Sequence, residues 1–132
     1  LERIGDLAVN IAEQSIGLAG LPEIDIPFDL PGMRTRVQAM LKNCLDALVN
    51  VDADMARRVC QADDEVDAIN REMYVQVEEA MAKNVSDLKQ QIRYLEVCRH
   101  LERIGDHCTN IAEDVVYMIK GEIVRHRPDT LK

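Results

Sequence analysis

The sequence has few aromatic residues, and this scarcity argues against β-rich folds. Its 132 residues include three Tyr, one Phe and no Trp, together with six Gly and four Pro. β-Sandwiches and barrels use aromatic and β-branched residues with frequent turn signals, whereas Pro here is confined to positions 22, 27, 31 and 128. The length suffices for one domain with a sizeable core, so we expect an all-α protein of helices packed on helices.

Long apolar runs, paired cysteine motifs and an excess of basic residues are also absent. No apolar run approaches the roughly 18 residues of a membrane span and no signal peptide is recognisable, which predicts a cytoplasmic protein. The four Cys residues form no C-x-x-C pair, so we expect small buried hydrophobes rather than zinc ligands or disulfides. The formal net charge of −8 argues against nucleic acid or an anionic membrane as the main partner.

An internal repeat is the most informative feature that is present. Residues 1–13, LERIGDLAVNIAE, match residues 101–113, LERIGDHCTNIAE, at ten of thirteen positions. A single match at an offset of 100 residues indicates duplication of a whole unit. The second copy follows a full set of predicted helices and the first follows none. We therefore infer a parent protein that extends at least about 85 residues upstream.

Hydrophobic periodicity and stop signals predict four helices, over about 1–19, 31–50, 53–83 and 87–125. Asp29 is expected to cap the second helix and Ser86 the fourth, because both residue types accept hydrogen bonds from free amides. Short connections make neighbouring helices antiparallel. The predicted organisation begins with the last helix of a truncated first unit (1–20) and an extended strap (21–32). A complete three-helix bundle (33–126) and a tail (127–132) follow.

Several single positions carry further expectations. The first helix has an apolar stripe that should be covered by self-association or by the other helices: Leu1, Ile4, Ala8, Ile11, Ser15 and Leu18. Leu48 belongs to the predicted core face of the second helix. Gly5 and Gly105 lie inside helices at a cost of roughly 1 kcal/mol relative to Ala, which suggests close approach of a neighbouring backbone or ligand. His100 and His107 are expected on the exposed surface, since Leu replaces His107 in the other copy.

Acidic residues at helical spacing form the candidate site. Asp63 and Asp67 lie four residues apart on the third predicted helix, and Glu102 and Asp106 repeat this spacing on the fourth. At about 100° per residue, each pair shares a face outside the apolar stripe, where like charges destabilise by a few tenths of a kcal/mol. Carboxylates without His or Cys suit hard cations, or iron or manganese held by oxygen ligands.

A solvated acidic face with local ion pairs is the alternative interpretation of these residues. Arg99 and Arg103 would then neutralise part of the charge on the fourth helix. The repeat favours the ligand interpretation, because solvation alone would not preserve polar identities after duplication. Four polar residues of the first copy recur in the second, where Glu2, Asp6, Asn10 and Glu13 become Glu102, Asp106, Asn110 and Glu113.

These stretches resemble the PhoU family of phosphate-transport regulators. The likeness rests on the two ERIGD segments, on RHLERIGDHCTNIAEDVVYMIKGEIVRH and on ADDEVDAI, and it covers essentially the whole chain as the C-terminal part of a longer member. It implies two tandem three-helix repeats with E(D)-x-x-x-D motifs. It further implies a regulator rather than an enzyme, and we expect a homodimer or a higher self-associated state. Such a protein restrains the phosphate-starvation response between a phosphate-specific ABC transporter and a sensor histidine kinase.

The resemblance also implies metal clusters on the bundle surface. One site would hold a divalent or trivalent metal, with iron preferred over zinc, nickel and manganese. Its four carboxylate ligands would be Asp63, Asp67, Glu102 and Asp106. Glu2 and Asp6 match the motif of the first repeat, and that site is expected to be incomplete here. Glu13 and Glu113 are additional candidate ligands. A register that begins at Asp64 would place Ala four residues on, so Asp63 is preferred.

Three other functions stay open on the sequence alone. A ferritin-like di-iron enzyme would use Glu-x-x-His on facing helices, a pattern that the sequence lacks. A histidine phosphotransfer bundle would need His100 or His107, neither of which has a distinctive setting. A metal-free helical interaction module would present its acidic face to a basic partner, and a metal assay separates this function from the metal-binding one.

Overall fold

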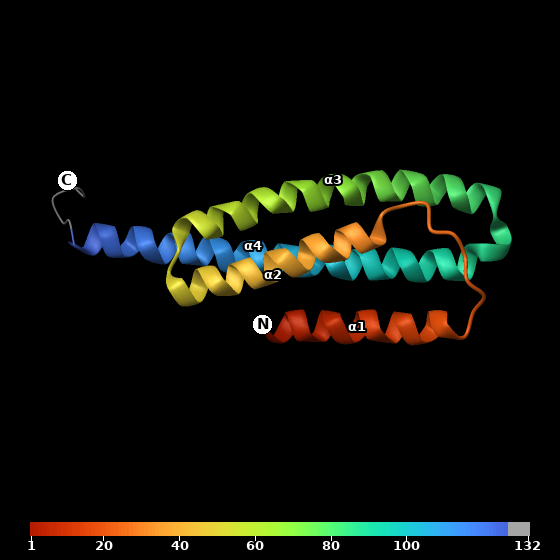
Figure 1. Ribbon diagram of the computed structural model, residues 1–132, viewed down its shortest axis with the longest axis horizontal. Coiled ribbons are helices and arrows are strands. Elements are labelled where there is room, and N and C mark those ends of the chain that lie inside the picture. The colour runs from red at the N-terminus through yellow and green to blue at the C-terminus, as the bar shows by residue number, and fades with distance from the viewer. Residues whose placement is uncertain (127–132) are drawn as a thin grey trace.

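The protein is a bundle of four helices, seen in a computed structural model that describes the backbone of residues 1–126 and the side chains of residues 1–121. The helices are α1 (Glu2–Ala19), α2 (Leu30–Asn50), α3 (Ala53–Lys83) and α4 (Leu88–His126). In Figure 1, α2, α3 and α4 run in alternating directions along the long horizontal axis, while α1 lies antiparallel along α4. The all-α prediction is confirmed. The predicted tail, residues 127–132, lies outside the described residues.

Local signals account for where the helices begin and end. Asp29 accepts a hydrogen bond from the Gly32 amide at 3.0 Å and caps α2, as predicted, with Pro31 in the first turn. Asp52 caps α3 in the same way through the Met55 amide at 3.0 Å. The prediction that Ser86 caps α4 is wrong. Ser86 lies inside a short 3₁₀ turn, η1 (Val85–Asp87), that reverses the chain before α4 begins.

The core lies between α2, α3 and α4, and α1 adds two residues to its edge. The prediction for Leu48 is wrong, because the core face of α2 ends at Ala47 and Leu48 is 40% exposed. Burial raises the pKa of the Cys98 thiol to about 12, so this side chain stays protonated and packs as a small hydrophobe. The fully buried side chains of the core include Met33, Met40, Met73, Val59, Val66, Val77, Val115, Cys44, Cys98 and Cys108.

Helix α1 packs on α4 alone among the other helices. Ile4 and Leu7 are buried there, and Arg93 of α4 donates a hydrogen bond to Gln14 of α1 at 3.2 Å. The predicted stripe is therefore covered only in part, since Ala8 is exposed. The strap that follows α1 contains neither helix nor strand, and Gln90 of α4 donates to the Pro22 carbonyl at 3.2 Å.

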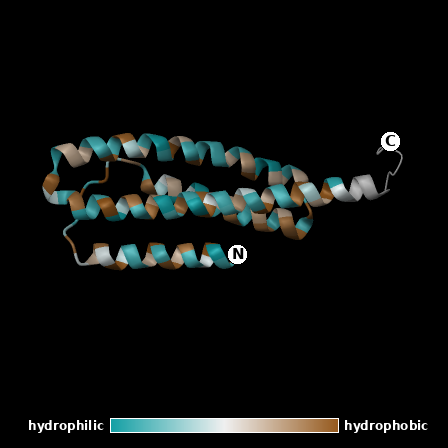
Figure 2. Ribbon diagram, turned by 180° about the vertical axis from the view of Figure 1, so that it is seen from behind, coloured by the Kyte–Doolittle hydropathy of each residue, from teal (hydrophilic) through white to brown (hydrophobic). Residues whose placement is uncertain are grey.

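Polar and apolar residues alternate along every helix, as Figure 2 shows. None of the helices in the described part of the chain combines the length and the apolar composition that crossing a membrane requires.

The histidine prediction needs correction, because His100 is buried between the helices and His107 is half-buried.

Candidate metal centre

Three carboxylates from two helices meet on the surface between α3 and α4. One oxygen each of Asp63, Asp67 and Asp106 lies within 4.8 Å of the other two. Asp63 and Asp67 are one turn apart on α3, and the antiparallel packing of α3 on α4 brings Asp106 opposite them. The structure therefore brings together three of the four carboxylates that the sequence predicts for one site.

The fourth carboxylate, Glu102, lies one turn before Asp106 on α4 and is held from across the helix pair. The amide Nδ2 of Asn70 on α3 donates a hydrogen bond to its Oε2 at 3.0 Å. Burial raises the pKa of Glu102, the carboxylates of Asp106 and Asp67 raise it further, and the Asn70 bond opposes these effects. Glu102 thus adjoins the three-carboxylate group without joining it.

The group brings negative charges close together, and no basic side chain among residues 1–121 pairs with them. Burial, followed by the charges of Asp67 and Asp106, raises the pKa of Asp63 to about 6. Burial and the charge of Asp67 likewise raise the pKa of Asp106. None of the ion pairs in the described part of the chain includes a carboxylate of this site. The charges repel one another across a partly buried surface.

Arg99 and Arg103 do not neutralise the site carboxylates through ion pairs, as the alternative interpretation requires. Arg99 pairs with Glu96 at 3.8 Å instead of with the site. Arg103 lowers the pKa of Glu102 but has no carboxylate within 4.0 Å among the described residues. A cation other than a side chain would therefore relieve the repulsion between the site carboxylates.

The atoms of the site fit a hard cation. Oδ1 of Asp63 and Oδ1 of Asn70 are both buried without a hydrogen-bond partner, and such atoms are costly unless something donates to them or coordinates them. The donors are all oxygen, which suits iron or manganese better than zinc, whose sites favour nitrogen and sulfur. Burial raises the pKa of the Cys60 thiol, and the charges of Glu113, Asp63 and Asp64 raise it further.

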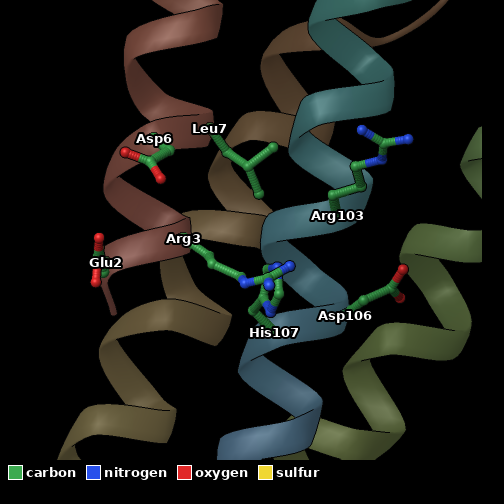
Figure 3. A pocket seen from close by; sticks show the side chains of 7 residues that line it. All are labelled: Glu2, Arg3, Asp6, Leu7, Arg103, Asp106 and His107. Carbon is green, nitrogen blue, oxygen red and sulfur yellow. The ribbon is translucent and has the colours of Figure 1, made fainter.

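The acidic residues of the first ERIGD copy lie across a groove that Asp106 also lines. Figure 3 shows the carboxylates of Glu2 and Asp6 pointing away from α4, whereas Asp106 points toward α3. Glu2 and Asp6 line an open groove of about 730 Å³ between α1 and α4, and Arg3 crosses it toward His107. In the described part of the chain, the structure does not bring Glu2 or Asp6 into the three-carboxylate group.

The two additional candidate ligands are also separate from the group. Glu113 is exposed on α4, seven residues beyond Asp106 and beside Cys60 of α3. Glu13 is exposed on α1, a helix that packs only on α4. Their role as ligands stays a prediction.

Two residues that support the site were not predicted as part of it. A Cβ on Gly105 would lie 3.4 Å from Oδ1 of Asp63 and 3.7 Å from Cε of Met40, so the neighbours there are two side chains at ordinary contact distance. Neither is the backbone or ligand whose close approach the sequence predicts. A Cβ on Gly5 would have no neighbouring atom of the described residues within 4 Å, so the expectation is not met there either. Asn70 follows Asp67 by three residues, and this helical spacing was the signal that could have identified it.

Comparison with known proteins identifies close relatives. The chain matches the PhoU domain family over residues 30–115. It is 39% identical over 124 residues to a "Phosphate-specific transport system accessory protein PhoU homolog" of Clostridium acetobutylicum, covering 94% of this chain and 57% of the relative. A protein with the same description from Pseudomonas aeruginosa is 38% identical over 130 residues, covering 96% of this chain and 52% of the relative.

A solved structure agrees with the fold. The crystal structure of PhoU from Pseudomonas aeruginosa superposes with a TM-score of 0.85 at 34% identity, covering 91% of this chain and 58% of the other. This chain thus spans about half the length of the curated relatives that it matches.

Proposed function

The chain belongs to the PhoU family, and on that basis we propose that it regulates phosphate uptake as an accessory to a phosphate-specific transport system. The relatives are described as accessory proteins of that system, which favours a regulator over an enzyme. The proposed role is negative regulation of the phosphate-starvation response. The protein acts in the cytoplasm as a homodimer that contacts a phosphate-specific ABC transporter and a sensor histidine kinase.

Metal binding at the carboxylates between α3 and α4 is the part of this proposal that the geometry supports. The observation that carries it is the meeting of three carboxylates from two helices, with no basic side chain of the described residues paired to them. Asp63, Asp67 and Asp106 would hold the metal, with Glu102 beside them, and iron or manganese suits these oxygen donors. A bound cation offsets the repulsion between the two helices and fixes their register.

A metal-free interaction module is the competing function, and the raised pKa of Asp63 supports it. The pKa of Asp63 is about 6, so this carboxyl holds a proton part of the time near neutral pH. A shared proton would then take the place of the cation, and the remaining carboxylates would form an acidic docking face. Metal content is therefore the property that distinguishes the two functions.

Elemental analysis of protein purified without chelator or affinity-tag metal tests the proposal. We expect bound metal in the wild type and its loss from the double variant Asp63→Ala with Asp106→Ala, together with a lower Tm. The matched control is Glu2→Ala with Asp6→Ala, which removes two acids of the other ERIGD copy and should leave the metal content unchanged. If the first double variant keeps both its metal content and its Tm, the metal site is wrong.

A further inference from the structure

Asn70 is a buried amide next to the proposed metal site. Its side chain is on α3 and the residue is 7% exposed. Nδ2 donates to Oε2 of Glu102 at 3.0 Å, while Oδ1 is buried with no hydrogen-bond partner. An unpaired buried acceptor costs about 1–3 kcal/mol, so an apolar residue would fill this position at lower cost. The amide therefore needs an explanation beyond packing.

The chemistry of Glu102 fixes which way the amide faces. An ionised carboxylate only accepts hydrogen bonds, so the NH₂ group of Asn70 must face Glu102. The carbonyl oxygen then lies in the same plane on the other edge of the amide group, where it is buried without a partner. Turning the amide over would place two acceptors against each other and would leave the NH₂ group without its partner.

The position of Asn70 on α3 places it on the face of the site. It follows Asp63 by seven residues and Asp67 by three, which on a helix corresponds to rotations of about 20° and 60°. Its partner Glu102 precedes Asp106 by four residues on α4. The Asn70–Glu102 contact thus continues the row of paired site residues by one further turn along the same two helices.

We propose that Asn70 is part of the metal site: Nδ2 positions Glu102, and Oδ1 serves as a neutral oxygen ligand. This inference depends on the proposed metal site. Amide carbonyl oxygens are common ligands of hard cations, alongside carboxylates and water. A cation at Oδ1 satisfies the one buried acceptor of Asn70 that the protein leaves unpaired. It also explains why an amide, which adds no charge, accompanies the crowded carboxylates.

A second buried amide supplies the matched control. Gln91 of α4 is 5% exposed and its Oε1 also lacks a partner, but it lies under the strap beside Pro27, away from the site carboxylates. Replacing either amide by Leu removes one unpaired acceptor from the bundle. Only the Asn70 substitution removes a proposed ligand and the hydrogen bond to Glu102.

Titration of the metal-free 132-residue chain with Mn²⁺, with free Mn²⁺ read by electron paramagnetic resonance, tests the proposal. We expect Asn70→Leu to weaken Mn²⁺ binding by about 10- to 100-fold, the usual effect of losing a supporting residue at a metal site. Gln91→Leu should leave the Kd within about twofold of the wild type. Circular dichroism verifies folding, and Asn70→Ala replaces the Leu variant if that variant does not fold.

Asn70→Asp separates the two parts of the role. It keeps an oxygen at the position of Oδ1 and removes the N–H that holds Glu102. We expect a lower Tm for the metal-free variant and Mn²⁺ binding at least tenfold tighter than in Asn70→Leu. Binding as weak as in Asn70→Leu overturns the ligand role of Oδ1.

The remaining outcomes divide cleanly between the two proposals. If the wild type binds Mn²⁺ and Asn70→Leu binds it equally well, Asn70 has a structural role only and the inference is wrong. If the wild type binds neither Mn²⁺ in the titration nor metal in the elemental analysis, the metal site itself is wrong, and the role of Asn70 is overturned with it.

Discussion

The two ERIGD segments have the same sequence in different surroundings. In α4, the second copy faces α3, where Asp106 meets Asp63 and Asp67. In α1, the first copy packs on α4, and the carboxylates of Glu2 and Asp6 point away from that helix. No helix of the described chain lies on the outer side of α1. The same motif therefore assembles a carboxylate group only where a second acidic helix faces it.

The glycine inside each ERIGD segment shows the same contrast. Gly105 is buried, and Oδ1 of Asp63 lies where a larger side chain would extend. Gly5 is exposed, with open space around its Cα. A glycine in mid-helix costs roughly 1 kcal/mol relative to Ala. At position 105 this cost is offset by close packing of α3 on α4, whereas at position 5 the described structure shows no such compensation.

The largest effect should come from filling these two glycine positions with Leu. Gly105→Leu would push its side chain into Asp63 and Met40, and overpacking of this kind costs about 3 kcal/mol. Gly5→Leu enters open space and should leave the free energy of unfolding unchanged or raise it by about 0.5 kcal/mol. Urea denaturation of both variants measures the difference. Equal stability would show that the environments of the two copies do not differ as described.

Much of the fold was predictable because its determinants are local. Asp29 and Pro31 mark the start of α2 through a side-chain cap and a missing amide, and they act on their own neighbours along the chain. The errors arise where tertiary context decides. Ser86 has the chemistry of a cap but lies in a 3₁₀ turn, and Leu48 follows the apolar period but falls beyond the last covered turn of α2.

The site was predictable up to the faces of the individual helices. Spacing places Asp63 with Asp67, and Glu102 with Asp106, because helical rotation is fixed. The relative position of α3 and α4 along their axes is a tertiary property. It decides that Asp106 joins the close group while Glu102 pairs with Asn70 instead. Spacing alone places Asn70 on the face of Asp67, but its role depends on Glu102, the residue that faces it from α4.

A smaller effect should appear in the pH dependence of the metal-free protein. The pKa of Asp63 is about 6 in the folded state, compared with 3.8 for an unperturbed group, so folding takes up protons between these values. Stability therefore falls as pH rises from about 4 to about 6, and the penalty is fully present above that range. Asp63→Asn removes the charge and should be about 1.5 kcal/mol more stable than the wild type at pH 7, after allowance for partial exposure.

Denaturation in the presence of a chelator at pH 4 and pH 7 measures this dependence. The advantage of Asp63→Asn should vanish at pH 4, where the wild-type carboxyl is protonated in the folded state. Asp64→Asn is the matched control, because Asp64 is the adjacent acid and is exposed. If Asp63→Asn and Asp64→Asn change the pH dependence of stability equally, the surroundings of Asp63 do not raise its pKa as described.

The smallest effect should distinguish the two glycines when each is replaced by Ala. Gly5→Ala gains helix propensity with no atom within 4 Å of the new methyl group, so α1 should become more stable by about 0.5–1 kcal/mol. Because α1 contacts α4 alone, the gain should appear locally, as about two- to fivefold slower hydrogen exchange of the α1 amides. Gly105→Ala gains the same propensity, but its methyl group would lie 3.4 Å from Oδ1 of Asp63, an ordinary contact that covers a buried, unpaired oxygen further and so reduces the benefit. Equal gains at both positions would mean that α4 tolerates a side chain at position 105 as freely as α1 does at position 5.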